Sequence, residues 1–268
     1  MTADRDPAAG LEEVQVDRPG RGVETDWVAV EAPLEIRLDD EPLVVTMRTP
    51  GRDRELAAGF LFTEGIVTGR EQVEAIEPCA DPLAYDPDNV VFVRLSHGAK
   101  RNREQVLKAR REFTAVAACG LCGKARLEDI YQRLPEIRPL ETSLELLRML
   151  PERMRRSQTL FDLTGGIHAA ALFDSGGELL GLEEDVGRHN AVDKLIGRSL
   201  LDGELPLDDR ILETSARAGF EIVQKAVMAA VPVLASVGAA SSLAVSLAND
   251  GGMALYSFLG NGRGHRYV

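Results

Sequence analysis

The chain has 268 residues, of which 44% are hydrophobic and 28% charged, a composition typical of globular proteins rather than disordered ones. Its 31 basic and 43 acidic residues give a formal net charge of −12, which disfavours duplex nucleic acid and anionic membrane surfaces as partners. Three cysteines are too few for a disulfide scaffold, and the first residues lack the apolar segment of a signal peptide, so we expect a cytoplasmic protein.

The first part of the chain is predicted to be rich in strands. Residues 1–22 are rich in charge, glycine and proline, which favours a flexible leader. A short helix with one apolar face is predicted at 55–62. The strand-like segments of this part are 28–38, 42–47 and 89–95.

The middle of the chain holds a CxxC motif and two predicted helices. The first helix, 127–134, follows the motif, and a segment with two prolines, 135–142, links it to the second. The second helix, 143–156, is acidic at its start and basic at its end, which suits the helix dipole despite Pro151.

From residue 164 the pattern changes to alternating strands and helices. A hairpin is predicted over 169–183 and a helix over 189–198. The segments that follow are strand 211–215, helix 219–230, strand 231–237, helix 241–250 and strand 253–259. This β–α–β–α–β order predicts parallel strands with right-handed crossovers, and it makes the uncharged run 226–248 a poor membrane span. The fold class is therefore α/β.

We divide the chain into four parts on this basis. They are a flexible leader at 1–22, a smaller β-rich N-terminal part at 23–118, the CxxC loop and linking helix at 119–142, and an α/β domain at 143–268.

Cys119 and Cys122 form the sharpest local feature. Two thiols at this spacing can close a disulfide, contribute half of a metal site or pass sulfur between them. Their position before a predicted helix would lower a thiol pKa. Two incidental loop cysteines remain an alternative. A zinc site would need two further ligands, and neither Cys79 nor the four histidines form a second paired motif, so no metal site is assigned.

Two polar segments, 164–170 and 184–194, form a second constellation. Asp185, His189 and Asp193 are spaced to share one helical face. A histidine flanked by carboxylates can act as an acid or base, but the spacing alone favours a buried structural cluster.

A third set contains Ser215, Arg217, Lys225 and the tail 258–263. Arg263 lies among glycines after a strand, a setting that suits an anionic group, although an ordinary C-terminal turn fits as well. Open α/β sheets place their ligands at the carboxyl ends of strands. The chain contains neither a Walker motif nor GxGxxG.

Taken together, these segments resemble the FdhD family of formate dehydrogenase accessory sulfurtransferases. EDVGRHNAVDKLIG is long and specific, and the matching segments run through most of the chain in the family's order. They are 57–67, 119–123, 164–172, 184–197, 215–245 and 258–263.

The resemblance implies a sulfurtransferase that carries sulfur as a persulfide from a cysteine desulfurase. The acceptor is the molybdenum cofactor in its bis(molybdopterin guanine dinucleotide) form (Mo-bis-MGD), before insertion into formate dehydrogenase. It further implies a homodimer, a cytidine-deaminase-like α/β sandwich, and no permanently bound metal. Cys119 would carry the persulfide. Thiol chemistry adds that Cys122 could then attack Cys119, closing a disulfide while sulfide leaves. The cofactor-holding segment would comprise Phe258, Leu259, Gly260, Asn261, Gly262 and Arg263.

Residue type alone adds Arg188 and Lys225 as cations for the phosphates of such a cofactor. Two other functions stay open: a non-catalytic cofactor-binding chaperone for formate dehydrogenase, and a thiol-disulfide oxidoreductase. A zinc-dependent deaminase is rejected because no HxE followed by PCxxC is present. Nucleic acids and membranes are not expected partners.

Overall fold

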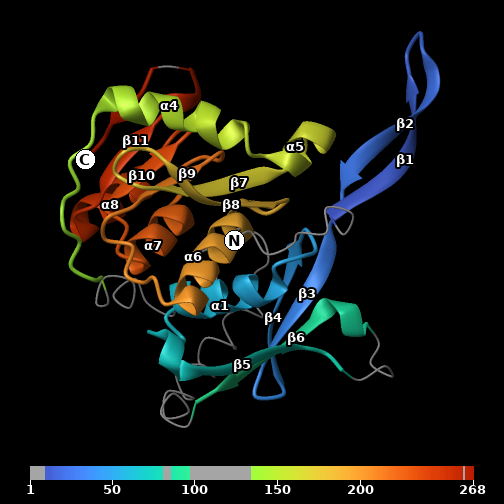
Figure 1. Ribbon diagram of the computed structural model, residues 1–268, viewed down its shortest axis with the longest axis horizontal. Helices are drawn as coiled ribbons and strands as arrows, with labels where there is room; N and C mark the ends of the chain where they lie inside the picture. Colours follow the sequence, from blue (N-terminus) through green and yellow to red (C-terminus); the bar gives the residue numbers. More distant parts are fainter. Residues whose placement is uncertain (1–9, 81–85, 97–133, 262) are drawn as a thin grey trace.

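The computed structural model describes residues 10–80, 86–96, 134–261 and 263–268. Two lobes pack against each other, and a two-stranded hairpin extends from them (Figure 1). The larger lobe is built on a six-stranded sheet in the order β12-β11-β10-β9-β7-β8. Its strands are β7 (His168–Phe173), β8 (Leu179–Asp185), β9 (Ile211–Thr214), β10 (Val233–Ser236), β11 (Ala254–Ser257) and β12 (His265–Arg266).

The parallel part of this sheet confirms the predicted βαβαβ order. Strands β9, β10 and β11 run parallel and are joined by α7 (Phe220–Met228) and α8 (Ser242–Gly251). Every residue of β9 and β10 is buried, which is typical of parallel strands covered on both faces. β7 pairs antiparallel with β9 and forms the predicted hairpin with β8. The expected α/β class is confirmed, and the cytidine-deaminase-like description stays a prediction.

Helices cover both faces of the large sheet (Figure 1). α6 (Arg188–Asp202), α7 and α8 pack on one face, where the leucines and valines of the strands form the main core. α4 (Leu144–Arg155) covers the other face and is followed by the short α5 (Thr159–Thr164). Ser143 caps α4 by accepting a hydrogen bond from the amide of Leu146 at 3.1 Å.

The smaller lobe is a four-stranded sheet in the order β4-β3-β6-β5, with α1 (Asp53–Thr63) lying between it and α6 (Figure 1). Its strands are β3 (Ala32–Leu38), β4 (Glu41–Arg48), β5 (Val73–Pro78) and β6 (Val90–Leu95), with 3-10 helices η2 (Arg70–Gln72) and η3 (Pro87–Asn89). The sequence does not predict β5. Its two buried residues, Val73 and Ile76, are three positions apart and so do not follow the alternation of a half-buried strand.

The flexible leader predicted for 1–22 is wrong in its second half. Leu11–Arg18 forms β1, which pairs antiparallel with β2 (Gly22–Ala29) over the whole length of both strands. The Pro19-Gly20 turn that suggested disorder in fact reverses the chain between the two strands, with Gly20 at a φ of 80°.

The run 226–248 forms the end of α7, strand β10 and the start of α8, as predicted. Among the helices of the described ranges, none combines the length and hydropathy needed to cross a membrane.

Candidate functional site

A pocket of about 660 Å³ opens at the carboxyl edge of the large sheet. Ser215 and Val237 follow the carboxyl ends of β9 and β10 directly, and Leu259 follows that of β11. His168 joins them because β7 runs the opposite way and begins at this edge. α4 and α5 form the opposite wall. The lining residues are Arg148, Pro151, Glu152, Met154, Arg155, Gln158, Phe161, Gly165, Gly166, Ile167, His168, Val186, Ser215, Val237, Leu259 and Gly260.

The pocket is basic although the chain as a whole is acidic. Arg148 and Arg155 line it from α4, one helical turn on either side of Glu152. Glu152 is paired with Arg156 at 3.1 Å. Arg155 lies over the Phe161 ring at 4.6 Å and pairs with Asp162. The volume falls within the range of small-molecule pockets, and the cations favour an anionic ligand.

The segment 258–263 borders this pocket only in part. Leu259 and Gly260 line it, whereas the Arg263 guanidinium lies 5.9 Å from the centre of the Phe258 ring. The main-chain carbonyl oxygen of Arg263 accepts hydrogen bonds from Nε and Nη2 of Arg148, at 3.2 and 2.7 Å. The predicted tail and the pocket-lining helix are therefore held together, while Gly262 lies outside the described residues.

The two cysteines of the CxxC motif, Cys119 and Cys122, lie outside the described residues. Their assigned role stays a prediction.

The 184–194 segment is mainly a lobe junction rather than a catalytic cluster. Asp185 ends β8 and does not share a helix with His189 and Asp193, because Gly187 caps α6 and the helix begins only at Arg188. The carboxylate of Asp185 is fully buried and pairs with Lys194 at 2.7 Å. The expected single helical face is therefore wrong, and the structural interpretation that the spacing favoured fits this residue.

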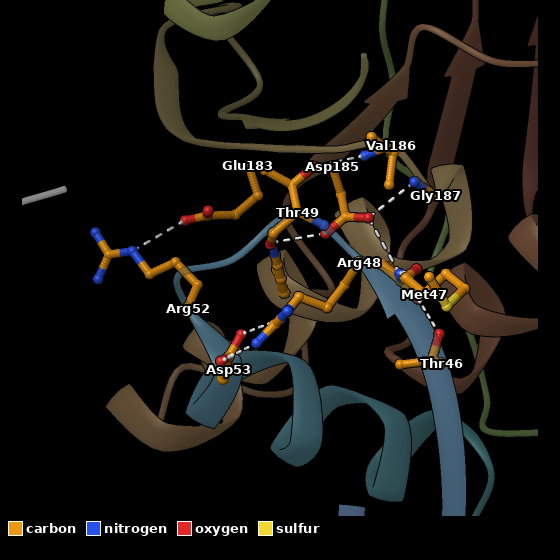
Figure 2. Close-up of polar contacts among 12 residues, drawn as sticks. Thr46, Met47, Arg48, Thr49, Arg52, Asp53, Glu183, Asp185, Val186 and Gly187 are labelled. Carbon is orange, nitrogen blue, oxygen red and sulfur yellow. Dashed lines mark hydrogen bonds and ion pairs between the residues drawn. The ribbon is translucent and has the colours of Figure 1, made fainter. Parts of the chain in front are cut away.

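Asp185 and Lys194 hold the segment that leads from β4 into α1. The amide of Thr49 donates to Asp185 at 3.2 Å (Figure 2). The Thr49 carbonyl accepts from Lys194 at 2.8 Å. Asn190 donates to both Asp185 and the Met47 carbonyl. The same junction contains Arg48, fully buried and bonded through two nitrogens to the Asp53 carboxylate.

Lys225 is likewise structural, which corrects its assignment as a phosphate-binding cation. Its ammonium group donates to both carboxylate oxygens of Asp193, at 2.9 and 2.8 Å, and to the Thr63 hydroxyl at 3.0 Å. Burial alone lowers the pKa of Lys225, but the charges of Asp193 and Glu64 outweigh it and raise the pKa. The residue stays a cation, yet it is buried between α1, α6 and α7 and is already paired.

Arg148 and Arg155 were missed as site residues. Arg155 belongs to the basic last turn, which the helix dipole already explains, whereas Arg148 lies nearer the start of the helix. The usable signal was their spacing, because residues seven apart lie on the same side of a helix.

One further buried group has no role in the pocket. Glu213 lies in β9 between Ala171 of β7 and Ala235 of β10. It is fully buried, and neither of its carboxylate oxygens has a hydrogen-bond partner among the described residues. Burial raises the pKa of Glu213 well above its ordinary range, because an apolar surrounding disfavours the charged carboxylate.

The titration of Glu213 should make stability fall as pH rises. The unfolded chain releases this proton near the ordinary pKa of 4.5, whereas the folded chain retains it to higher pH. Folding therefore becomes less favourable as pH rises from that value toward the folded-state pKa. In urea unfolding at pH 5 and pH 8, Glu213→Gln should flatten this loss, and the exposed Glu204→Gln should leave it unchanged. An equal loss in wild type and Glu213→Gln would contradict the assignment.

The fold and the pocket define this chain as a two-lobed α/β protein with a basic pocket at the carboxyl edge of its larger sheet. The sequence model of the FdhD/NarQ family matches residues 29–268. The chain belongs to this family.

Curated relatives support the assignment over most of the chain. A Streptomyces coelicolor protein named sulfur carrier protein FdhD is 48% identical over 240 residues, which cover 87% of this chain and 84% of the relative. A protein of the same name from Anaeromyxobacter dehalogenans is 46% identical over 269 residues, covering 97% and 91%.

A solved structure shares the fold. It belongs to a Desulfotalea psychrophila protein assigned as a formate dehydrogenase accessory protein, and it superimposes with a TM-score of 0.72 over 96% of this chain and 95% of the other. The sequence identity is 24%, so this likeness concerns the fold alone.

Proposed function

We propose that this protein is a sulfurtransferase that carries sulfur to the molybdenum cofactor required by formate dehydrogenase. The observation that carries the proposal is the basic pocket at the carboxyl edge of the sheet. Relatives that share almost half of its residues are named sulfur carrier proteins, which supports the same role here.

The pocket suits the guanine nucleotide part of this cofactor. Phosphates need cations, and Arg148 and Arg155 stand on one wall of the pocket while the Gly165-Gly166 turn lines another. Apolar side chains such as Met154 and Val237 offer a surface for a base. The cofactor is cargo in this proposal, bound for modification and then released.

Cys119 is the proposed sulfur carrier. Its thiolate attacks the outer sulfur of a cysteine desulfurase persulfide, forming the Cys119 persulfide while the desulfurase thiolate leaves. Cys122 then attacks Sγ of Cys119, the bond to the outer sulfur breaks, and hydrosulfide leaves toward the bound cofactor. The two cysteines end as a disulfide, which a cellular dithiol must reduce before the next cycle. We also propose that the protein is a homodimer.

Mass spectrometry of the intact protein tests the carrier role directly. After incubation with a cysteine desulfurase and cysteine, wild type should gain the mass of one sulfur atom, and Cys119→Ala should gain none. Cys79→Ala is the matched control and should gain sulfur as wild type does. Formate dehydrogenase matured with Cys119→Ala should be inactive.

The other outcomes separate the alternatives. Sulfur gain in Cys119→Ala, or full maturation of formate dehydrogenase by that variant, would overturn the persulfide role. No sulfur gain in any variant, with the cofactor still bound, would favour a non-catalytic chaperone. Reduction of a generic protein disulfide would favour a thiol-disulfide oxidoreductase.

A further inference from the structure

His168 is the histidine that lines the pocket. It begins β7 at the sheet edge and lines the pocket with the two arginines of α4. Its Nδ1 lies 3.4 Å from the hydroxyl of Ser215, and that hydroxyl accepts a hydrogen bond from the amide of Ala169 at 2.9 Å. This contact engages Nδ1 of a ring that lines the pocket.

The charges around His168 oppose its protonation in the empty pocket. Burial lowers the pKa of His168, and Arg188 and His189 at the start of α6 lower it further, while Asp185 of β8 opposes them in part. Arg148 and Arg155 face the same pocket from α4, together with the Glu152 carboxylate. The imidazole is therefore neutral near pH 7.

Resting on the proposed function, we propose that His168 is a proton-coupled ligand for the phosphate groups that bind in this pocket. A bound anion reverses the balance of charge at the ring, so the imidazole takes up a proton from solvent and becomes a third cationic donor beside the two arginines. The arginines supply fixed charge at every relevant pH. His168 adds charge only when an anion is present.

The coupling has a definite sign. The pKa of His168 is higher in the complex than in the free protein, so binding takes up protons at any pH between the two values. Affinity must rise as pH falls through the complex value and level off below the free value. One coupled proton changes affinity by at most about tenfold per pH unit.

Calorimetric titration with GDP-mannose tests the coupling. Both phosphates of this probe are esterified, so the probe itself does not titrate between pH 6 and 8. Titrations at one pH in two buffers of different ionisation enthalpy give the number of protons taken up. We expect uptake in wild type, and affinity at pH 6 about tenfold above that at pH 8.

The matched variants assign the proton to one residue. His168→Gln and His168→Asn should bind the probe with little proton uptake and a flat pH profile. His265→Gln changes an exposed histidine outside the pocket lining and should behave as wild type. Thermal unfolding of each variant confirms that it is folded.

Failure of the proton coupling and failure of the proposed function would give different results. Binding by wild type without proton uptake, or uptake that persists in both His168 variants, would overturn the coupling and leave the proposed function intact. No binding of the probe by folded wild type would overturn both the coupling and the nucleotide assignment of the pocket.

Discussion

Gly59→Ala should destabilise this protein by about 3 kcal/mol or more, although alanine is the better helix former. In an isolated helix the same change would gain about 1 kcal/mol. Here α1 and α6 touch backbone to backbone, and a Cβ added at Gly59 would overlap the carbonyl group of Asp193 in α6. The overlapping atoms belong to a helix backbone, so no side chain can move aside to relieve the clash.

Gly197 makes the reciprocal contact and should give the same result. A Cβ there would overlap the carbonyl oxygen of Glu55 and the amide nitrogen of Gly59 in α1. Gly219→Ala is the matched control, because a Cβ at that position meets no atom within 4 Å. The midpoint and slope of urea unfolding measure each change.

Gly59→Ala and Gly197→Ala should differ sharply from Gly219→Ala in stability. Wild-type stability in both Gly59→Ala and Gly197→Ala would show that the helices can separate without cost. The two lobes would then not be held by this contact. Loss of stability in Gly219→Ala equal to that in the others would point to a general effect of glycine replacement instead.

The larger lobe could be predicted because its sequence and its structure follow the same local rules. Fully buried, mainly apolar strands such as 233–236 alternate with helices that begin at serine or glycine caps, so the parallel order follows without knowledge of distant contacts. The family motifs could be recognised, but their physical role could not. Asp185 and Lys194 act across the lobe junction on Thr49, more than 130 residues away in the sequence.

The lining of the pocket could be predicted from the sequence only in part. Its walls come from the ends of strands, predicted from position alone, and from two arginines of α4 that no local pattern connects to them. Lys225 shows the opposite error, since a lysine in a recognised segment was assigned to the ligand although its partner is the buried Asp193. Residue type predicts which chemistry is possible, and only the packing decides whether a charge faces a ligand or another side chain.

Lys194→Met should lower stability by about 3–5 kcal/mol, because it leaves the Asp185 carboxylate buried without its counter-ion. The amides of Thr49 and Gly187 and the side chain of Asn190 still donate to that carboxylate, so the group stays partly satisfied. The Thr49 carbonyl loses its lysine donor in the same substitution. Unfolding in urea at pH 7 gives the measurement.

A double-mutant cycle separates the ion pair from its neighbours. Asp185→Asn alone leaves the Lys194 ammonium buried with a carbonyl as its remaining partner, and it should cost a similar amount. The double variant Asp185→Asn/Lys194→Met buries no charge at this position and should lose clearly less than the sum of the two single changes. Arg156→Met breaks the exposed pair with Glu152 and should change stability by about 1 kcal/mol or less.

Strict additivity in the cycle would mean that the pair contributes nothing beyond its separate hydrogen bonds. The junction would then depend on the backbone contacts of Thr49 and on the two glycines, and the charges of the motif would have another role. A coupling of several kcal/mol would instead make the buried pair the reason that the motif requires an acid and a lysine together. Because both groups lie in the larger lobe and both bond to Thr49, their loss should also loosen the smaller lobe from the larger one.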